Sequence, residues 1–246
     1  MAPNGKRSPI VLCYHAVSDG WNHGLSVPPA TFERQIARLA SVYPPLTAEE
    51  VVLSGRRGVH ITFDDAFCSV ASIVPTLQRL KVPATVFACT SYAEDGAPLR
   101  VPELNLEADE HPAELVTMDW SALRELAEGG IEVGSHAMTH PYLTQLSQSE
   151  LERELVESRA RIEDELGRAC RFLAYPYGDQ DERVRAAAQA AGYFAAFAMS
   201  SDLTRADRFA IPRVGIWRGD HALRAAAKIA LQHARKRPVW HAGPAT

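Results

Sequence analysis

Two adjacent aspartates, Asp64 and Asp65, raise a chemical question, because neighbouring carboxylates repel each other wherever they are partly buried. They follow the apolar run 59–63, which has the composition of a buried strand. Neighbouring side chains at a strand end point in different directions, so one carboxylate can bind a cation while the other stays free beside it. The cation would hold down the pKa of the free carboxyl group, leaving an ionised base at neutral pH. The alternative, a pair of N-caps for a helix that begins near Val70, explains one aspartate better than two.

Two histidines, His136 and His140, have a spacing that suits two ligands of one metal ion. On a helix such residues would share a face, but Gly134 precedes the pair and Pro141 disfavours helical geometry at His140. We therefore expect a strand end followed by a tight turn. By itself such a pair is a weak signal of function. Together with an aspartate from another strand end, it forms a candidate site of two histidines and one carboxylate with open coordination positions.

Short β-rich runs alternate with amphipathic segments along the chain. The expected strands are residues 10–17, 59–63, 84–89, 131–135, 171–175, 193–199 and 214–217. The expected helices are residues 30–43, 70–81, 119–130, 146–167, 181–192 and 220–235. This alternation without hairpin signals predicts a parallel sheet covered by helices, and the number of repeats favours a closed or nearly closed barrel. We expect one α/β domain over residues 1–246 with about seven parallel strands.

Polar side chains recur at the ends of these strands, and functional groups collect at the carboxyl ends of strands in a parallel α/β barrel. The first run brings Tyr14 and His15, and the two aspartates follow the second. His136 follows the run 131–135, and the turn "PYG" (176–178) follows 171–175. We therefore expect these side chains to converge on one rim of the barrel.

One segment, residues 91–117, interrupts the alternation. It is polar, rich in proline and acidic residues, and only weakly periodic. A loop of this length in a compact domain is usually functional or disordered. We interpret it as an insertion that forms one wall of a substrate groove, with a mobile surface excursion as the alternative.

Composition and charge are those of an ordinary globular protein, with 46% apolar and 23% charged residues and a formal net charge of -4. This balance gives no electrostatic reason to expect nucleic acid or anionic membrane as a partner. No stretch approaches the length of a membrane span, and the N-terminal apolar run is far shorter than that of a signal peptide. The four widely spaced cysteines are expected to be buried, reduced thiols. We therefore expect a cytoplasmic protein and assign no oligomeric state.

Three motifs, "TFDDAF", "GSHAMTH" and "FLAYPYG", in this order and spacing resemble those of the polysaccharide deacetylase family (the NodB homology domain, carbohydrate esterase family 4). "VLCYHAV" near the start and "IPRVGIW" near the end are similar to further landmarks of its "YPYG" branch. The resemblance covers residues 10–217. It implies a distorted (β/α) barrel and removal of N-acetyl groups from an N-acetylhexosamine-containing saccharide or glycoconjugate with a divalent metal ion, often zinc.

The resemblance also implies roles for single residues. Asp65, His136 and His140 would bind the metal ion, and Asp64 would be the catalytic base. In the turn that begins at Pro176, the backbone N–H of Tyr177 would face the oxyanion that develops during hydrolysis.

The chain departs from the family pattern at three places. Ala66 replaces a usual glycine, which fits if φ there is negative. Ala174 replaces an arginine that orients the base. Arg213 is a candidate to supply that charge from another strand and to contact the substrate, with a surface cation as the alternative. The late motif that provides the general acid is absent, with Trp217 and Arg218 in its place. His15 and His221 are alternative acids, and His15 is favoured because it lies at a strand end.

Two further functions are consistent with these motifs. The same metal site could hydrolyse a non-sugar amide or imide, because the motifs specify the reaction more than the molecule that carries the acyl group. The missing acid motif leaves a third interpretation, a non-catalytic member that binds glycans.

Overall fold

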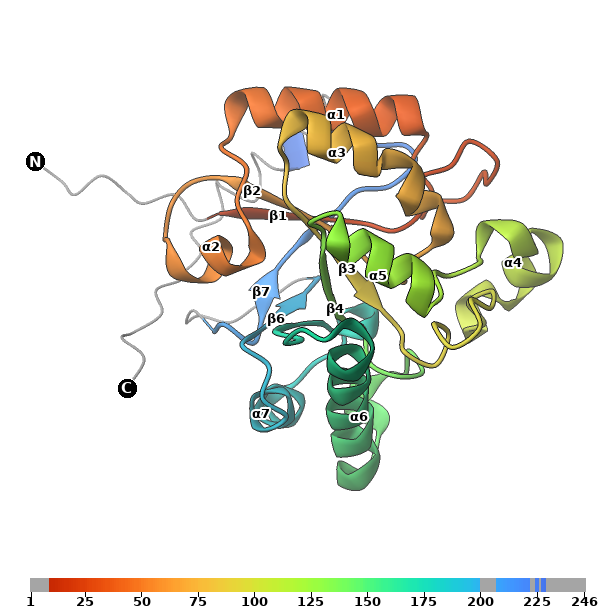
Figure 1. The fold of residues 1–246 in the computed structure, drawn as a ribbon, viewed down its shortest axis with the longest axis vertical. Helices are drawn as coiled ribbons and strands as arrows, with labels where there is room; N and C mark the ends of the chain where they lie inside the picture. Colours follow the sequence, from red (N-terminus) through yellow and green to blue (C-terminus); the bar gives the residue numbers. More distant parts are fainter. Residues whose placement is uncertain (1–8, 200–206, 222–223, 226, 229–246) are drawn as a thin grey trace, which may run out of the picture.

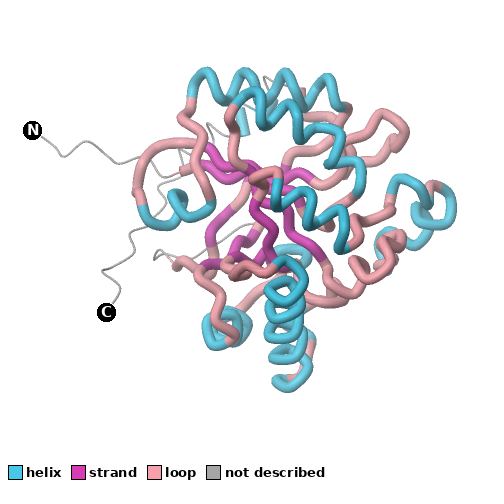
Figure 2. Tube along the Cα trace, in the orientation of Figure 1, coloured by secondary structure: helices cyan, strands magenta, loops and turns pink. Residues whose placement is uncertain are grey.

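A computed structural model describes residues 9–199, 207–221, 224–225 and 227–228. Eight parallel strands form one sheet in the order β7-β6-β5-β4-β3-β2-β1-β8. Helices surround this sheet, with α1 and α3 together on one side and α6 and α7 on the opposite side (Figure 1). The strands occupy the centre of the molecule, and loops connect them to the helices around it (Figure 2).

The elements have the following bounds. The strands are β1 (Ile10–Tyr14), β2 (Val59–Phe63), β3 (Ala84–Ala88), β4 (Glu132–Ser135), β5 (Phe172–Ala174), β6 (Ala195–Ala198), β7 (Ile211–Pro212) and β8 (Val214–Gly215). The α-helices are α1 (Pro29–Val42), α2 (Ala48–Leu53), α3 (Val74–Leu80), α4 (Asn105–Glu110), α5 (Trp120–Glu128), α6 (Gln148–Leu166) and α7 (Glu182–Ala190). Short 3-10 turns cover Cys68–Ile73, Pro102–Leu104, Pro112–Glu114, Leu143–Gln145 and Pro176–Gly178.

The two ends of the sheet meet at one short segment. β7 pairs with β6, β8 pairs with β1, and Arg213 alone separates β7 from β8 along the chain. The Arg213 amide donates to the Ala198 carbonyl at 2.9 Å, and the Ile216 amide donates to the Cys13 carbonyl at 2.9 Å. This segment therefore bridges the seam of a nearly closed barrel. The structure confirms the expected distorted (β/α) barrel, with eight strands in place of about seven.

Alternation along the strands divides the core into two layers. The outer layer joins strand side chains such as Leu12 and Phe63 to helix side chains such as Leu155. The inner layer contains the following side chains from the strands and from α2: Val11, Phe87, Phe172, Ala174, Ala195, Phe197, Ile211, Ala48, Val51 and Val52. Helix α2 covers the amino-terminal end of the barrel, where Leu46 donates its amide to the Val59 carbonyl. The opposite end is left for the site.

Most expected elements are present within one to three residues of their predicted bounds. Polar side chains cap the first turns of two of the expected helices. Asp119 caps α5, and Ser147 forms a capping box at the start of α6. The expected helix 220–235 falls largely on residues outside the described part of the chain. Cys13, Cys89 and Cys170 are buried, as predicted. The prediction is wrong for Cys68, which is exposed at the start of a 3-10 turn.

Across the described part of the chain, none of the helices has the combination of length and apolar character that crossing a bilayer requires.

Candidate active site

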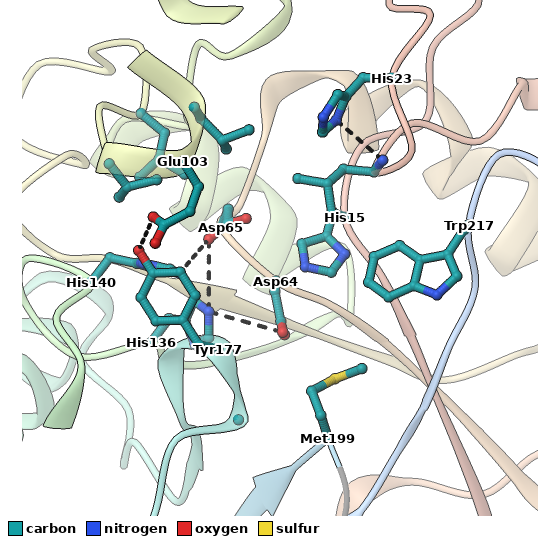
Figure 3. Close-up of a pocket in the computed structure, with 15 residues that line it drawn as sticks. His15, His23, Asp64, Asp65, Glu103, His136, His140, Tyr177, Met199 and Trp217 are labelled. Atoms are coloured by element: carbon teal, nitrogen blue, oxygen red, sulfur yellow. Dashed lines mark hydrogen bonds and ion pairs between the residues drawn. The ribbon is translucent and has the colours of Figure 1, made fainter. Parts of the chain in front are cut away.

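The carboxyl ends of the strands converge on one pocket of about 440 Å³. Asp64 and Asp65 follow β2, His136 and His140 follow β4, and Tyr177 follows β5. His15 follows β1 and faces the same space (Figure 3). The parallel barrel thus brings together side chains that are more than 100 residues apart in the sequence, as expected for strand ends of this architecture.

The three predicted metal ligands form one cluster. Asp65 Oδ1 lies 3.7 Å from His136 Nε2 and 3.4 Å from His140 Nε2. One ligand atom from each residue falls within 4.8 Å of the others. All three side chains are buried, and Asp65 Oδ1 has no hydrogen-bond partner. A buried carboxylate oxygen without a donor is costly unless something positive satisfies it.

The electrostatics of this cluster favour a cation. Burial lowers the pKa of His136, and burial together with His136 lowers the pKa of His140 to about 3, so both rings are neutral at neutral pH. Burial and the charge of Asp64 raise the pKa of Asp65 well above its usual range. Neutral imidazoles and a carboxylate held close together without a donor are the ligands that a divalent ion such as zinc requires. The three residues therefore fit such an ion.

The ring of His136 is fixed from behind. Its Nδ1 lies 2.7 Å from the carbonyl oxygen of Ala174, so Nδ1 carries the proton and Nε2 faces Asp65. A histidine that donates its second ring N–H to a carbonyl is the usual arrangement at protein metal sites. Ala174, one of the departures from the family pattern, thus contributes its backbone to the site.

Glu154 organises the turn between the two histidines, and the sequence did not single it out. This buried side chain of α6 accepts hydrogen bonds from the amides of Met138 and Thr139, at 2.7 and 3.1 Å, and from the Thr139 hydroxyl at 2.7 Å. The signal was present in the sequence, because Glu154 falls within the stripe of α6 that faces the core.

Asp64 is bound by Arg213, which lies behind it and outside the pocket. Arg213 Nη1 and Nη2 donate to the two carboxylate oxygens at 2.6 and 2.7 Å, and Cys13 Sγ donates to Oδ2 at 3.3 Å. Burial on its own raises the pKa of Asp64, but the charge and the hydrogen bonds of Arg213 lower it well below its usual range. Asp64 is therefore an ionised carboxylate at neutral pH. Arg213 occupies the position behind the base, and it does not line the pocket.

Left-handed backbone is concentrated at this rim. Positive φ occurs at Asp65 (67°), Ala66 (50°), Ala137 (63°), His140 (62°) and Tyr177 (59°). Each such residue costs roughly 1–3 kcal/mol when it is not glycine. The condition under which Ala66 would replace glycine without strain, a negative φ, is not met. The chain turns sharply after Asp65, and the Ala66 carbonyl accepts from the Met118 amide at 2.8 Å. Strained backbone at a site is typical of residues held in position for function.

The two candidate acids have different positions. His15 lines the pocket, lies within 4.8 Å of Asp64, and stacks on Trp217 with ring centroids 5.6 Å apart. Burial lowers the pKa of His15 to about 4, and its Nδ1 has no hydrogen-bond partner. His221 is exposed and lies outside the pocket. The structure therefore brings His15, and not His221, to the aspartates.

The insertion at residues 91–117 packs beside the pocket. Leu99, Val101 and Leu104 belong to a separate apolar cluster with Trp21 and Phe67, and these three insertion residues also line the pocket. Glu103 lines it too, and it accepts hydrogen bonds from the hydroxyls of the neighbouring Tyr142 and Tyr177. Nothing in the sequence distinguishes Glu103 from the many other acidic residues of this segment.

Comparisons with known proteins agree with this fold. A family model described as "Polysaccharide deacetylase" matches residues 54–196. The YxkH protein of Bacillus subtilis (strain 168) is 25% identical over 192 residues, which is 74% of this chain and 61% of YxkH. The chitooligosaccharide deacetylase of Bradyrhizobium sp. (strain ANU 289) is 29% identical over 144 residues, which is 57% of this chain and 55% of that protein. The solved structure of IcaB from Ammonifex degensii has a TM-score of 0.73 at 22% identity, over 90% of this chain and 97% of IcaB.

The fold and the family model define the class of the protein: the chain belongs to the polysaccharide deacetylase family. The likeness to IcaB supports the shared fold. The chain matches 61% and 55% of the lengths of the two curated relatives.

Proposed function

We propose that this protein is a metal-dependent hydrolase that removes N-acetyl groups from an N-acetylhexosamine-containing saccharide or glycoconjugate. The observation that carries this proposal is the buried cluster of Asp65, His136 and His140 beside an ionised Asp64 in one pocket. Family membership and the chitooligosaccharide deacetylase among the relatives support the amide and the sugar parts of the proposal.

The residues of the site have two roles: some would bind a metal ion, and others would transfer protons. Asp65, His136 and His140 would hold a divalent ion, with zinc the best match to the two imidazoles and one carboxylate. When bound, such an ion supplies Lewis acidity toward water and the acyl carbonyl. Asp64 then acts as the base that takes the proton of the attacking water, and the bidentate contact from Arg213 keeps it ionised and oriented.

Two further groups would complete the reaction. The backbone N–H of Tyr177 would donate to the developing oxyanion. His15 would protonate the leaving amine. Because the lowered pKa of His15 leaves the ring neutral before reaction, its proton would come from Asp64, which lies within 4.8 Å. In this scheme one proton passes from water through Asp64 and His15 to the amine, so no external acid is needed.

The test is acetate release from chitooligosaccharides by protein stripped with chelator and reloaded with zinc. We expect activity to depend on the added metal, and Asp64→Asn to lower kcat by about 10²- to 10⁴-fold, as expected for loss of a general base. Asp95→Asn, which changes an exposed aspartate of the insertion, should leave activity unchanged.

Two outcomes would contradict the proposal. Equal activity in the Asp64→Asn protein would remove the assigned base. Saccharide binding without any acetate release from metal-loaded protein would favour a glycan-binding role.

A further inference from the structure

A strained tyrosine occupies the turn after β5. The Gly178 amide donates to the Tyr175 carbonyl at 2.8 Å, and Tyr177 has φ 59° and ψ 0°. These are the features of a type II turn with Pro176 at its second position and Tyr177 at its third. The third position of that turn strongly favours glycine or asparagine, because a Cβ is crowded when φ is positive. A tyrosine there needs contacts that hold it in place.

The Tyr177 side chain has three such contacts. Its ring stacks on Tyr142 with centroids 4.0 Å apart and an interplanar angle of 7°. The same ring meets His140 edge to face at 4.5 Å. Its hydroxyl donates to one carboxylate oxygen of Glu103 at 2.8 Å, and the Tyr142 hydroxyl donates to the other at 2.8 Å (Figure 3 shows the contact with Tyr177).

Glu103 is therefore the point that joins three distant segments. It comes from the insertion, Tyr142 from the segment after His140, and Tyr177 from the turn after β5. Two hydrogen bonds to one carboxylate fix both ring planes, and a charged acceptor makes these bonds stronger than bonds to a neutral group. Although slight burial opposes it, the donation from the two hydroxyls lowers the pKa of Glu103, so the carboxylate is ionised at neutral pH.

We propose that Glu103 is a positioning residue, which holds the ring of Tyr177 and thereby directs the backbone N–H of Tyr177 into the pocket. The catalytic consequence rests on the proposed function, because that N–H matters to the reaction only if an oxyanion forms beside it. The placement of Tyr177 by Glu103 does not depend on the reaction and can be measured separately.

Substitution of Glu103 should lower kcat and leave KM nearly unchanged. Glu103→Ala removes both hydrogen bonds and allows the turn to relax, so that an interaction made mainly in the transition state is lost. We expect kcat to fall about 10- to 100-fold, with KM within about twofold, at equal zinc content. Glu103→Gln should stay within about threefold of the parent, because its amide can face one hydroxyl with oxygen and the other with nitrogen. Tyr142→Phe, which keeps the ring stack, should have a smaller effect than Glu103→Ala.

The backbone amide resonance of Tyr177 in an NMR spectrum supplies a readout that needs no activity. It should shift or broaden in Glu103→Ala, and it should keep its position in Glu110→Ala, which removes an exposed carboxylate at the end of α4 outside the pocket. Glu110→Ala should also leave kcat unchanged.

Three results would overturn the inference. These are an unchanged Tyr177 resonance in Glu103→Ala, a rise in KM with unchanged kcat, and a loss of zinc that parallels the loss of activity. The second result would mean that Glu103 binds substrate directly. If the parent protein releases no acetate at all, the proposed function fails, whereas the resonance of Tyr177 still decides whether Glu103 positions it.

Discussion

Among the individual residues, Arg213 and Asp64 form the most tightly bound pair of the site. Both residues are almost fully buried, at 2% and 3% exposure, and the guanidinium contacts both carboxylate oxygens. Burying two charges is costly, and a bidentate geometry is the arrangement that best offsets this cost. Arg213 also donates to the Thr62 hydroxyl at 3.1 Å, which fixes the guanidinium inside the barrel. Arg213 therefore keeps the Asp64 carboxylate ionised and at a fixed place in the pocket.

Arg213→Lys should weaken the base and shift its titration. Lysine keeps the positive charge but cannot form the two parallel bonds, so the pKa of Asp64 should rise from its lowered value. Activity that needs ionised Asp64 is lost as pH falls through that pKa, so the acidic limb of kcat/KM should move to higher pH. We also expect kcat/KM at neutral pH to fall about 10- to 100-fold.

The matched control for this experiment is Arg171→Lys, an arginine that contacts Glu49 at the surface. Its pH profile should coincide with that of the parent. An unshifted acidic limb in Arg213→Lys would show that Arg213 does not set the ionisation of Asp64.

At the scale of elements, helix α6 and the turn after β4 act as one unit. The turn reverses the chain through positive φ at Ala137 and His140, which places both imidazoles on one side. Glu154 satisfies the amides that this geometry exposes, from a helix that also packs apolar side chains such as Leu151 and Leu155 against the core. The histidine spacing alone does not create the site, because α6 must hold the turn in shape.

Loss of that carboxylate should weaken metal binding. Glu154 accepts three hydrogen bonds, and the single amide oxygen of glutamine in Glu154→Gln cannot accept all of them. The turn should therefore hold His136 and His140 less firmly. We expect zinc affinity to fall about 10- to 100-fold in competition with a chromophoric chelator, the range typical of outer-shell substitutions. Glu157→Ala, at an exposed position of the same helix, should bind zinc like the parent. Equal affinities in all three proteins would contradict this role of α6.

The sequence predicted elements well where they are long and patterned. Residues 59–63 and the long helix that begins after Ser147 have clear apolar patterns and end signals, and both were found. The strand Ile211–Pro212 was missed because it has two residues, one of them a proline, and exists only through pairing with β6. Helix α2 was missed because its six residues are too few to show a helical period.

The candidate site was predictable to the extent that its residues sit at strand ends. Asp65, His136 and His140 could be grouped from motif and position. Glu154 and Glu103 act through contacts between segments distant in the sequence, and the positive φ of Ala66 depends on how residues 66 and 118 meet. Such features depend on tertiary structure and leave little local signal.

For the molecule as a whole, the groups that form the site lower the free energy of unfolding. The rim carries adjacent buried aspartates and five residues with positive φ that are not glycine. The remaining surface of the barrel is covered by ordinary helix packing, and α2 covers the other end. Helix packing therefore stabilises most of the barrel, whereas the buried aspartates and the positive φ angles at the rim lower its stability in exchange for function.

Asp65→Asn should therefore stabilise the metal-free protein near neutral pH. Burial and Asp64 raise the pKa of Asp65, so the folded state binds more protons than the unfolded state, and stability falls as pH rises above the unfolded pKa of about 4. Asparagine avoids this loss. We expect the Tm of the metal-free variant to exceed that of the metal-free parent by roughly 2–6 °C at about pH 7, with a difference that shrinks toward pH 4.

Zinc should reverse this order, because it should raise the Tm of the parent and hardly change that of Asp65→Asn. Asp95→Asn, the exposed control, should match the parent in both conditions. A metal-free Asp65→Asn protein that is less stable than the parent at neutral pH would show that Asp65 is not destabilising when no ion is bound.

The most direct test of the central claim, that Asp65, His136 and His140 bind a divalent ion beside Asp64, is an anomalous difference map from crystals grown with zinc. The account predicts one strong peak within coordination distance of a carboxylate oxygen of Asp65 and of Nε2 of both histidines, with Asp64 still paired to Arg213. A peak among Cys13, His15 and Asp64, or no peak at either group of residues, would contradict it.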